Sequence, residues 1–208
     1  FGQAYSLRAL CYFHLIQFYQ QTYIGHEQAP GVPLYITPTT SSTPGNPRGT
    51  VEEVYARINK DIERGISLLK DAEEQGVTQI HKSHSDYYVA NGIKSRIALV
   101  QNRWKDALDA AQIALEKPDL KLAGTSDLTK GFNQLGMVSV LWGAEIQKSD
   151  QIGAYASFFG HMDATAGMHG SYDRKCISAW LYKQMGLQDI RRISWWKGEI
   201  ATALEASF

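Results

Sequence analysis

Apolar residues occupy twelve of the sixteen positions in residues 4–19, AYSLRALCYFHLIQFY. At 100° per residue, Ser6, His14 and Gln17 fall within one narrow arc, which predicts a helix that is packed on most sides and wetted along a thin stripe. Arg8 lies away from that stripe, so we expect it to be partly buried and to bind a carboxylate or a carbonyl. Cys11 is on the apolar side and is expected to be a buried free thiol.

A proline-rich excursion follows in residues 20–49. It holds five of the six prolines together with four glycines. Proline at this density forbids a helix and disfavours a central strand. The letters GVPLYI predict one short extended piece within it. Loops of this length in a compact domain tend to be functional or to make contacts.

The clearest helix start in the sequence lies at Thr50. Glu53 follows three residues later, and the two form a capping box in which the hydroxyl accepts from the backbone of Glu53 and the carboxylate reaches back. Apolar residues then recur at steps of three and four. The pattern predicts a helix that runs to about Glu74 and stops near Gly76. Its apolar positions are Val51, Val54, Tyr55, Ile58, Ile62, Ile66 and Leu69.

A pair of helices is predicted over residues 85–102 and 104–117. Only Asn102 and Arg103 separate them, so the helices must return antiparallel. We expect Trp104 to face its hairpin partner in the core, and Pro118 to end the second helix. Small residues on that helix permit close approach of a neighbour; they are Ala107, Ala110, Ala111 and Ala114.

The pattern weakens beyond residue 120. Residues 139–146, SVLWGAEI, fit either a strand or a buried helical turn. Residues 151–173 are rich in glycine and aromatic residues and are expected to be a loop. A short helix is predicted over roughly residues 175–185. We therefore expect a helical scaffold over residues 1–120 and a loop-rich, partly helical segment over residues 121–208.

Composition narrows the function classes. The chain has 21 basic and 21 acidic residues and no net charge, which argues against a nucleic-acid binder. No run approaches the roughly 20 apolar residues that span a bilayer. The sequence opens on Phe1 inside a predicted helix, without an initiator methionine or a signal peptide. We take it as a fragment or processed chain that lacks its targeting information.

Motifs for metal binding and catalysis are weak. His81 and His84 are three residues apart, and His161 and His169 are eight apart, but no carboxylate or cysteine completes a ligand set at a recognisable spacing. No GxSxG, HExxH, phosphate-binding loop or dinucleotide fingerprint occurs. A glycosidase pair of carboxylates stays open, although nothing in the sequence nominates one. No catalytic residue, metal or cofactor is predicted.

The stretch RWKDALDAAQIALEKP resembles the second helix of a tetratricopeptide repeat, with Ala107, Ala114 and Leu115 at the matching positions. A more specific resemblance covers most of the chain. It rests on four segments in order, AYSLRALCYFHLIQFYQ, GVPLYIT, RGTVEEVYARINKDIERGISLL and ANGIKSRIALVQNRWKDALDAA. These resemble the SusD/RagB family of outer-membrane nutrient-binding lipoproteins. Ser95 stands where the family usually has alanine before the arginine.

This resemblance implies an all-α fold of tetratricopeptide-like helical hairpins, with long irregular loops and few or no strands. Family members are lipid-anchored on the outer face of the outer membrane. They capture oligosaccharides without hydrolysing them and pass them to a SusC-like TonB-dependent transporter. The anchoring cysteine would lie upstream of Phe1, and much of the ligand-binding part would lie downstream of Phe208.

Sugar binding uses flat aromatic faces flanked by polar side chains. The densest group of such residues in a glycine-rich stretch is Tyr155, Phe158, Phe159, His161, Asp163, His169 and Tyr172. We expect these residues to contact the glycan; packing of the loop onto the helices is the alternative. Trp195 and Trp196 are expected to form a structural junction with the Asp189–Arg191 pair. A tetratricopeptide-type scaffold that binds a protein, with no sugar site of its own, is the second hypothesis.

Overall fold

The computed structural model describes residues 1–77, 79–128, 134–145 and 177–194. It divides into two compact units. The first holds Phe1–Leu122 and Leu135–Ala144, and the second holds the described parts of Ala123–Gln134 and Glu145–Phe208. Each unit is described by itself.

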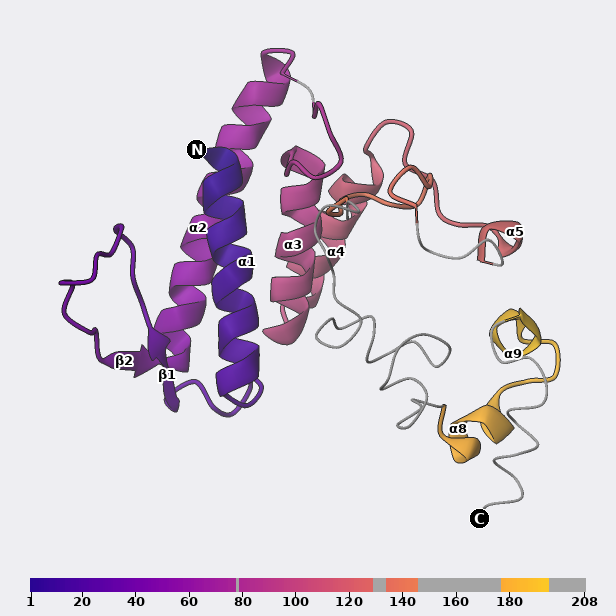
Figure 1. The fold of residues 1–208 in the computed structure, drawn as a ribbon, viewed down its shortest axis with the longest axis horizontal. Coiled ribbons are helices and arrows are strands. Elements are labelled where there is room, and N and C mark those ends of the chain that lie inside the picture. Colours follow the sequence, from indigo (N-terminus) through magenta and orange to yellow (C-terminus); the bar gives the residue numbers. More distant parts are fainter. Residues whose placement is uncertain (78, 129–133, 146–176, 195–208) are drawn as a thin grey trace. The chain divides into compact units, whose positions relative to one another are not determined.

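Two helical hairpins lie side by side in the first unit (Figure 1). Helix α1 packs on α2, α2 on α3, and α3 on α4. A small antiparallel sheet of β1 and β2 sits at one end of the first pair. The elements are α1 (Gly2–Tyr19), β1 (Pro30–Pro33), β2 (Arg48–Thr50), α2 (Val51–Glu74), α3 (Tyr87–Val100) and α4 (Trp104–Leu115). The prediction of an all-α fold built from helical hairpins is confirmed.

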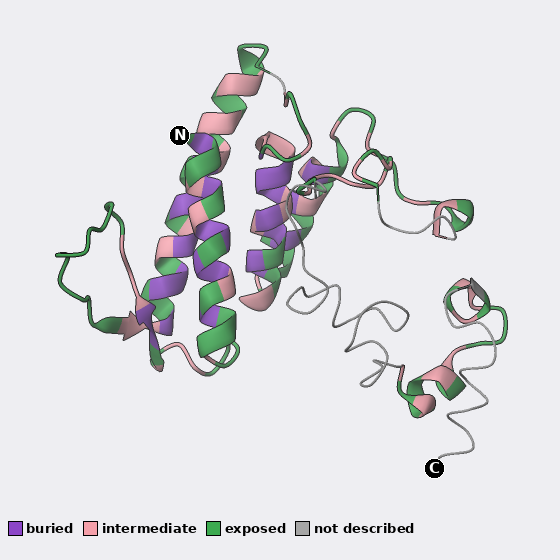
Figure 2. Cartoon of the chain, in the orientation of Figure 1, coloured by how far each residue is buried: buried purple, intermediate pink, exposed green. Residues whose placement is uncertain are grey.

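The core lies where the three helices α1, α2 and α3 meet (Figure 2). Its side chains come from one face of each helix and from Val32 of β1. The most deeply buried apolar side chains are Ala9, Phe13, Ile16, Val51, Val54, Tyr55, Ile58, Ile62, Ala90 and Ile97. Burying so many large side chains is the main stabilisation of this unit.

Helices α1 and α2 approach closely at two glycines. Gly2 faces Leu69, and Gly65 faces Ser6, whose hydroxyl donates to the Gly2 carbonyl at 3.1 Å. Ser6 is fully buried. The prediction of a wetted stripe through Ser6 was therefore wrong. The close contact between α1 and α2 needs small residues. Serine meets this need as alanine does, because its hydroxyl forms a hydrogen bond within its own helix.

Helix α2 begins as the sequence predicts. The Thr50 hydroxyl accepts from the Glu53 backbone at 3.1 Å, and the Glu53 carboxylate accepts from the Thr50 backbone at 2.7 Å. The helix ends at Glu74, and Gly76 follows with a positive φ of 79°. The capping box and both helix ends are confirmed.

The α3–α4 hairpin turns at Asn102, which has a φ of 56°. Its seam is built from small residues: Ala107, Ala110 and Ala114 are buried, and the Ser95 hydroxyl donates to the Ala107 carbonyl at 2.8 Å. Trp104 is 62% exposed, so the prediction that it lies in the core was wrong. A seam this narrow leaves no room for an indole, which therefore lies on the outer face.

Residues 134–145 contain no strand and no helix, but a turn closes where the Val140 backbone donates to the Met137 carbonyl at 3.1 Å. They run across the α3–α4 hairpin, where Leu141 contacts the position of Gly92. The Trp142 indole donates to the Ser83 carbonyl at 2.9 Å, and the Lys82 ammonium donates to the Met137 carbonyl at 2.9 Å. These bonds attach the segment to the loop before α3.

The described residues of the second unit include three short helices, α5 (Thr125–Leu128), α8 (Ala179–Gln184) and α9 (Ile190–Ser194). Arg191 binds Asp189 through both carboxylate oxygens, and Arg192 lies over the Tyr182 ring with its guanidinium carbon 4.5 Å from the centroid. The predicted junction of this pair with Trp195 and Trp196 lies outside the described residues. No helix in the described part of the chain is long and apolar enough to cross a membrane.

Candidate functional site

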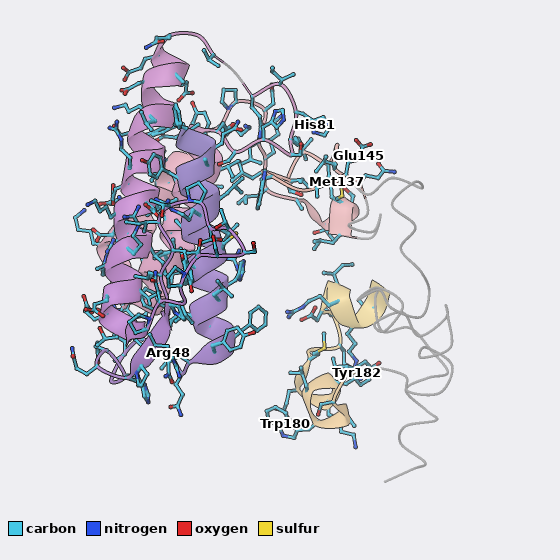
Figure 3. The ribbon with its side chains drawn as sticks, turned by 60° about the vertical axis from the view of Figure 1, so that its left-hand side comes forward. Arg48, His81, Met137, Glu145, Trp180 and Tyr182 are labelled. Atoms are coloured by element: carbon cyan, nitrogen blue, oxygen red, sulfur yellow. The ribbon has the colours of Figure 1, made fainter. Side chains whose placement is uncertain are left out.

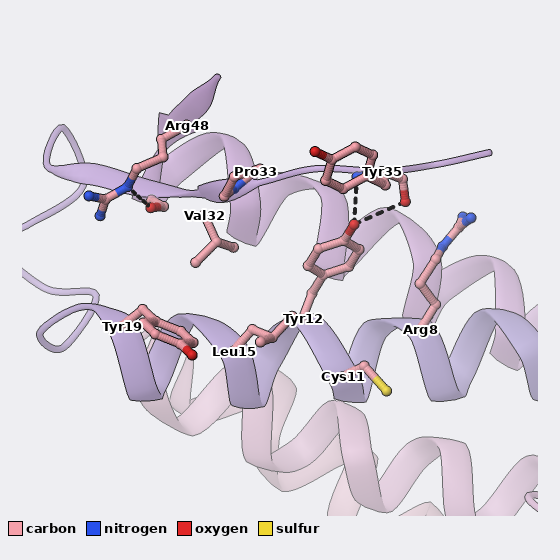
Figure 4. A pocket seen from close by; sticks show the side chains of 10 residues that line it. Arg8, Cys11, Tyr12, Leu15, Tyr19, Val32, Pro33, Tyr35 and Arg48 are labelled. Atoms are coloured by element: carbon pink, nitrogen blue, oxygen red, sulfur yellow. Dashed lines mark hydrogen bonds between the residues drawn. The ribbon is translucent and has the colours of Figure 1, made fainter. Parts of the chain in front are cut away.

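A pocket of about 650 Å³ opens between α1 and the strand β1; we call it the α1–β1 pocket (Figure 4). This volume is typical of small-molecule sites, which measure roughly 300–1,000 Å³. Its lining consists of Arg8, Cys11, Tyr12, Leu15, Tyr19, Gly31, Val32, Pro33, Tyr35 and Arg48. All of them belong to the first unit.

One wall of the pocket is a face of α1 that no helix of the described residues covers. Cys11, Leu15 and Tyr19 are spaced four residues apart and so lie on one side of the helix. Tyr19 is 69% exposed and Cys11 is also exposed. The prediction of a buried thiol at Cys11 was therefore wrong. Helix α1 buries one face on α2 and α3, and its opposite face, although apolar, borders the pocket and solvent.

The opposite wall is Val32, Pro33 and Tyr35. Tyr12 holds this wall in place, because its hydroxyl donates to the Tyr35 carbonyl at 2.9 Å and accepts from the Tyr35 backbone at 2.6 Å. The Tyr12 hydroxyl thus makes the two hydrogen bonds to the Tyr35 backbone that a neighbouring β-strand could make. The pocket wall is fixed without any ligand.

Arg48 fixes the same wall from the other end. Its Nε donates to the Gly31 carbonyl at 2.6 Å and its Nη2 to the Pro30 carbonyl at 2.8 Å. Gln20 also donates to the Pro30 carbonyl, at 2.8 Å. Within the described residues, the recorded partners of Arg48 are all carbonyls and none is a carboxylate. Within the described residues, its positive charge at the pocket lining is therefore not paired with a carboxylate.

Arg8 lies at the far end of the pocket from Arg48 (Figure 4). It binds Asp61 of α2 through two hydrogen bonds, and its Nη1 donates to the Ile36 carbonyl at 3.2 Å. Asp61 is 1% exposed and also accepts two bonds from Arg57. The prediction that Arg8 is partly buried and paired is confirmed, and the structure identifies its partner as Asp61.

The cluster changes the acidity of its carboxyl. Burial raises the pKa of Asp61, but the hydrogen bonds from Arg8 and Arg57 outweigh burial, and the pKa lies below its ordinary value. The hydrogen bond to Asp61 likewise raises the pKa of the Arg8 guanidinium. Two arginines share one carboxylate here, so a net positive charge remains beside the pocket.

Among the residues that the structure describes, the lining of the pocket contains two arginines and no aspartate or glutamate. Its remaining surface is made by tyrosines, aliphatic side chains and backbone. This arrangement can bind a ligand that has an apolar or flat face together with acceptor atoms. It holds no pair of carboxylates for acid–base chemistry.

The predicted glycan contacts, Tyr155, Phe158, Phe159, His161, Asp163, His169 and Tyr172, all lie outside the described residues, as do Trp195, Trp196 and Cys176. The pocket was not predicted from the sequence. Two features of the sequence indicate it: residues at steps of four on one exposed face of α1, and the extended GVPLY piece that follows. The contact between the two depends on Tyr12, which periodicity alone assigns to the core.

His81 and His84 have ring centroids 6.3 Å apart, and His81 Nδ1 lies 2.8 Å from the Ser83 hydroxyl. In the parts of the chain that the structure describes, no three side chains of histidine, cysteine, aspartate or glutamate come close enough together to hold a metal ion. His81 lies at the end of the unit opposite Arg48 (Figure 3).

Residues 1–99 match the model of the SusD-like family described as "Starch-binding associating with outer membrane". Among solved structures, a SusD-like carbohydrate-binding protein of Bacteroides vulgatus ATCC 8482 is 29% identical with a TM-score of 0.66; the match covers 78% of this chain and 33% of that one. No curated protein matches the chain.

Two further solved structures share the fold. A SusD superfamily protein of Bacteroides fragilis is 28% identical with a TM-score of 0.51, and covers 63% of this chain and 29% of its own. One of Bacteroides thetaiotaomicron VPI-5482 is 21% identical with a TM-score of 0.62, and covers 73% and 32%. This chain thus spans about a third of the length of the solved proteins that it matches. The residues that match the family model build α1, α2, most of α3 and the α1–β1 pocket, and over these residues the chain is similar to the SusD-like family.

Proposed function

We propose that this chain is part of a non-catalytic protein that binds oligosaccharides or polysaccharides at the surface of the outer membrane. The observation that carries the proposal is the match of residues 1–99 to a family described as starch-binding and outer-membrane-associated. The 29% identity to a SusD-like carbohydrate-binding protein supports the same ligand class. The α1–β1 pocket adds a preformed concave site to the helical scaffold.

In this proposal the bound glycan passes to a SusC-like TonB-dependent transporter in the same membrane, and a lipid anchor outside this chain holds the protein at the surface. The aromatic and polar side chains of residues 155–172 supply contacts to the sugar. Their composition supports this role, because aromatic faces pack on pyranose C–H groups while histidine and aspartate bind hydroxyls.

Affinity electrophoresis of the purified protein through gels that contain single polysaccharides tests the binding. We expect one or more glycans to retard the protein. Chromatography of the same glycans after incubation with the protein should show no shortened products. Migration that no polysaccharide alters would contradict the proposed binding, and shortened products would contradict a non-catalytic role.

A tetratricopeptide-type protein scaffold is the second candidate, and the outer face of α4 favours it. Trp104, Leu108 and Leu115 are 62%, 57% and 53% exposed. At 100° per residue they fall within one narrow arc, so they form a single apolar stripe. A helix of another protein could pack on such a stripe.

Both candidates allow docking to the outer-membrane transporter, so glycan binding separates them: co-purification with the transporter and no retardation by any glycan would favour the scaffold. If the stripe on α4 is the docking surface, the double substitution Trp104→Ser and Leu108→Ser abolishes co-purification. If the protein binds a glycan as well, retardation by that glycan should be unchanged in the same variant. Loss of glycan binding together with co-purification would instead indicate that the variant has lost its fold, which circular dichroism would reveal.

A further inference from the structure

We infer that the α1–β1 pocket binds an acidic saccharide, one that carries uronate or sulfate groups, and prefers it to a neutral glycan. This inference rests on the proposed function and deepens it. The family description names starch, which is neutral, and says nothing of this pocket.

The described side chains at the pocket carry a net positive charge. Arg8 and Arg48 both line the pocket, and among the described residues no acidic side chain does. Arg8 shares the single carboxylate of Asp61 with Arg57, so the three charged side chains at that end sum to one positive charge. Arg48 adds a second positive charge at the other end. A site of this kind favours an anion over a neutral ligand of equal size.

Arg48 has N–H donors beyond those that bind the pocket wall. A guanidinium has five N–H groups. Arg48 uses its Nε on Gly31 and one N–H of Nη2 on Pro30, and its Nη1 has no recorded partner in the described chain. These two carbonyl bonds hold the guanidinium plane in a fixed orientation. A carboxylate or sulfate oxygen can therefore accept from Nη1 at no cost to the contacts of the wall.

The pocket also offers an exposed aromatic surface. Tyr19 lies at the same end of the pocket as Arg48 (Figure 4). It is 69% exposed, and its neighbour Phe18 is 82% exposed. A tyrosine ring left open beside a positive charge suits a sugar that presents C–H groups on one face and an acidic group at its edge. The chemistry of the two side chains matches the two parts of a uronate residue.

The wall of the pocket opposite α1 is rigid. Tyr12 holds both backbone groups of Tyr35, and Arg8 holds the Ile36 carbonyl. The opposite wall of the pocket is therefore already ordered before a ligand binds. Preorganised sites lose less entropy on binding.

Calorimetry with matched glycans tests the preference for charge. The probes are oligogalacturonate, oligoguluronate and sulfated chondroitin oligosaccharides, and each acidic uronate oligomer is paired with its own carboxyl-reduced form. We expect one acidic oligosaccharide to bind roughly tenfold more tightly than its neutral counterpart, as one lost charge-assisted hydrogen bond requires. Equal affinity for the two members of every pair would overturn the inference.

Variants locate the site. Arg48→Gln and Tyr19→Ala should each weaken the acidic ligand by roughly tenfold, because each removes one contact. Lys105→Gln is the matched control, since Lys105 is an exposed cation of α4 outside the pocket lining. A loss in Lys105→Gln as large as that in Arg48→Gln would mean that non-specific charge attraction explains the preference, and would overturn the inference.

Cys11 supplies a local readout, because its exposed thiol lies in the pocket wall. In a Cys176→Ser background, the acidic ligand should slow the reaction of Cys11 with a maleimide, and Arg48→Gln should remove this protection. Glycan binding that leaves Cys11 unprotected and is unaffected by Arg48→Gln would refute this inference and leave the proposed function standing. Failure of every glycan, acidic or neutral, to bind would refute both.

Discussion

Arg8 on α1 and Asp61 on α2 are joined by two hydrogen bonds, 2.7 Å from Nε to Oδ2 and 2.8 Å from Nη2 to Oδ1. Arg57 binds the same carboxylate from one helical turn away. Because Arg8 also lines the α1–β1 pocket, this pair connects the packing of the first hairpin to the site. The stability of the helix pair and the shape of the pocket therefore depend on the same residues.

Substitution of Asp61→Asn should destabilise the protein by about 2–4 kcal/mol, because it leaves two arginines beside a site that no longer carries a counter-charge. Arg8→Gln should cost less, since Arg57 still pairs with Asp61. Urea denaturation measures both. Lys70→Gln is the control, because its partner Glu74 and Lys70 itself are exposed, and such pairs contribute about 0–1 kcal/mol. Equal losses in Asp61→Asn and Lys70→Gln would contradict this account.

The same pair predicts a pH dependence. The folded pKa of Asp61 lies below its ordinary value of 3.8. A carboxyl with a depressed folded pKa stabilises the protein above its unfolded pKa, and this contribution is lost as the pH falls through the folded value. The stability difference between wild type and Asp61→Asn should therefore be largest near neutral pH and shrink below pH 3.8. Chemical denaturation at several pH values measures it; a difference that grows on acidification has the opposite sign to the prediction.

Gly65→Ala should destabilise the protein, although alanine is the better helix former. An added Cβ would lie 3.0 Å from the Ser6 nitrogen and 3.1 Å from the Gly2 carbonyl oxygen, so the helices would have to separate. Overpacking of this kind costs about 1–3 kcal/mol. Gly92→Ala is the matched control, because its Cβ would meet a Leu141 methyl at 3.3 Å that can turn aside. Thermal unfolding of both variants decides the question: a Gly65→Ala protein as stable as wild type would refute the close crossing.

Thr50→Ala should cost about 1 kcal/mol, the usual contribution of a helix N-cap. The reason is that the backbone of Glu53 loses its acceptor at the start of α2. Urea denaturation measures the loss, with Thr39→Ala, an exposed position of the excursion, as the control. A loss in Thr39→Ala equal to that in Thr50→Ala would argue against a specific role for the cap.

Tyr12→Phe should loosen the pocket wall while leaving the core packed. The substitution removes one acceptor and one donor for Tyr35, at a cost of about 1–2 kcal/mol for the two bonds. Hydrogen exchange at the Tyr35 amide should accelerate, and amides of α3 should not change. Unchanged protection of Tyr35 would show that other contacts hold the wall.

Local signals in the sequence predicted much of the fold. The Thr50–Glu53 cap, the three-and-four spacing of α2 and the short Asn102–Arg103 turn each specify structure within a few residues. The need of Arg8 for a carboxylate or carbonyl partner also followed from its place on an apolar helix. Which carboxylate it binds did not follow, because Asp61 is 53 positions away and has the same local pattern as its solvated neighbours.

The errors share one physical cause, which is that periodicity shows that a face is apolar but does not show what covers it. Ser6 is buried because a glycine of α2 lies opposite, whereas Cys11 and Trp104 are exposed because no helix of the described unit lies over them. The pocket was missed for the same reason. It is formed between α1 and an excursion that returns to it through the bonds of Tyr12, a tertiary contact with no local signal.

The most direct test of the central claim is calorimetric titration of the purified protein with a panel of neutral and acidic oligosaccharides, followed by mass spectrometry of the recovered sugar. Our account predicts saturable binding of at least one oligosaccharide, which is recovered at its original mass. The absence of binding across the panel, or recovery of cleaved sugar, would contradict it.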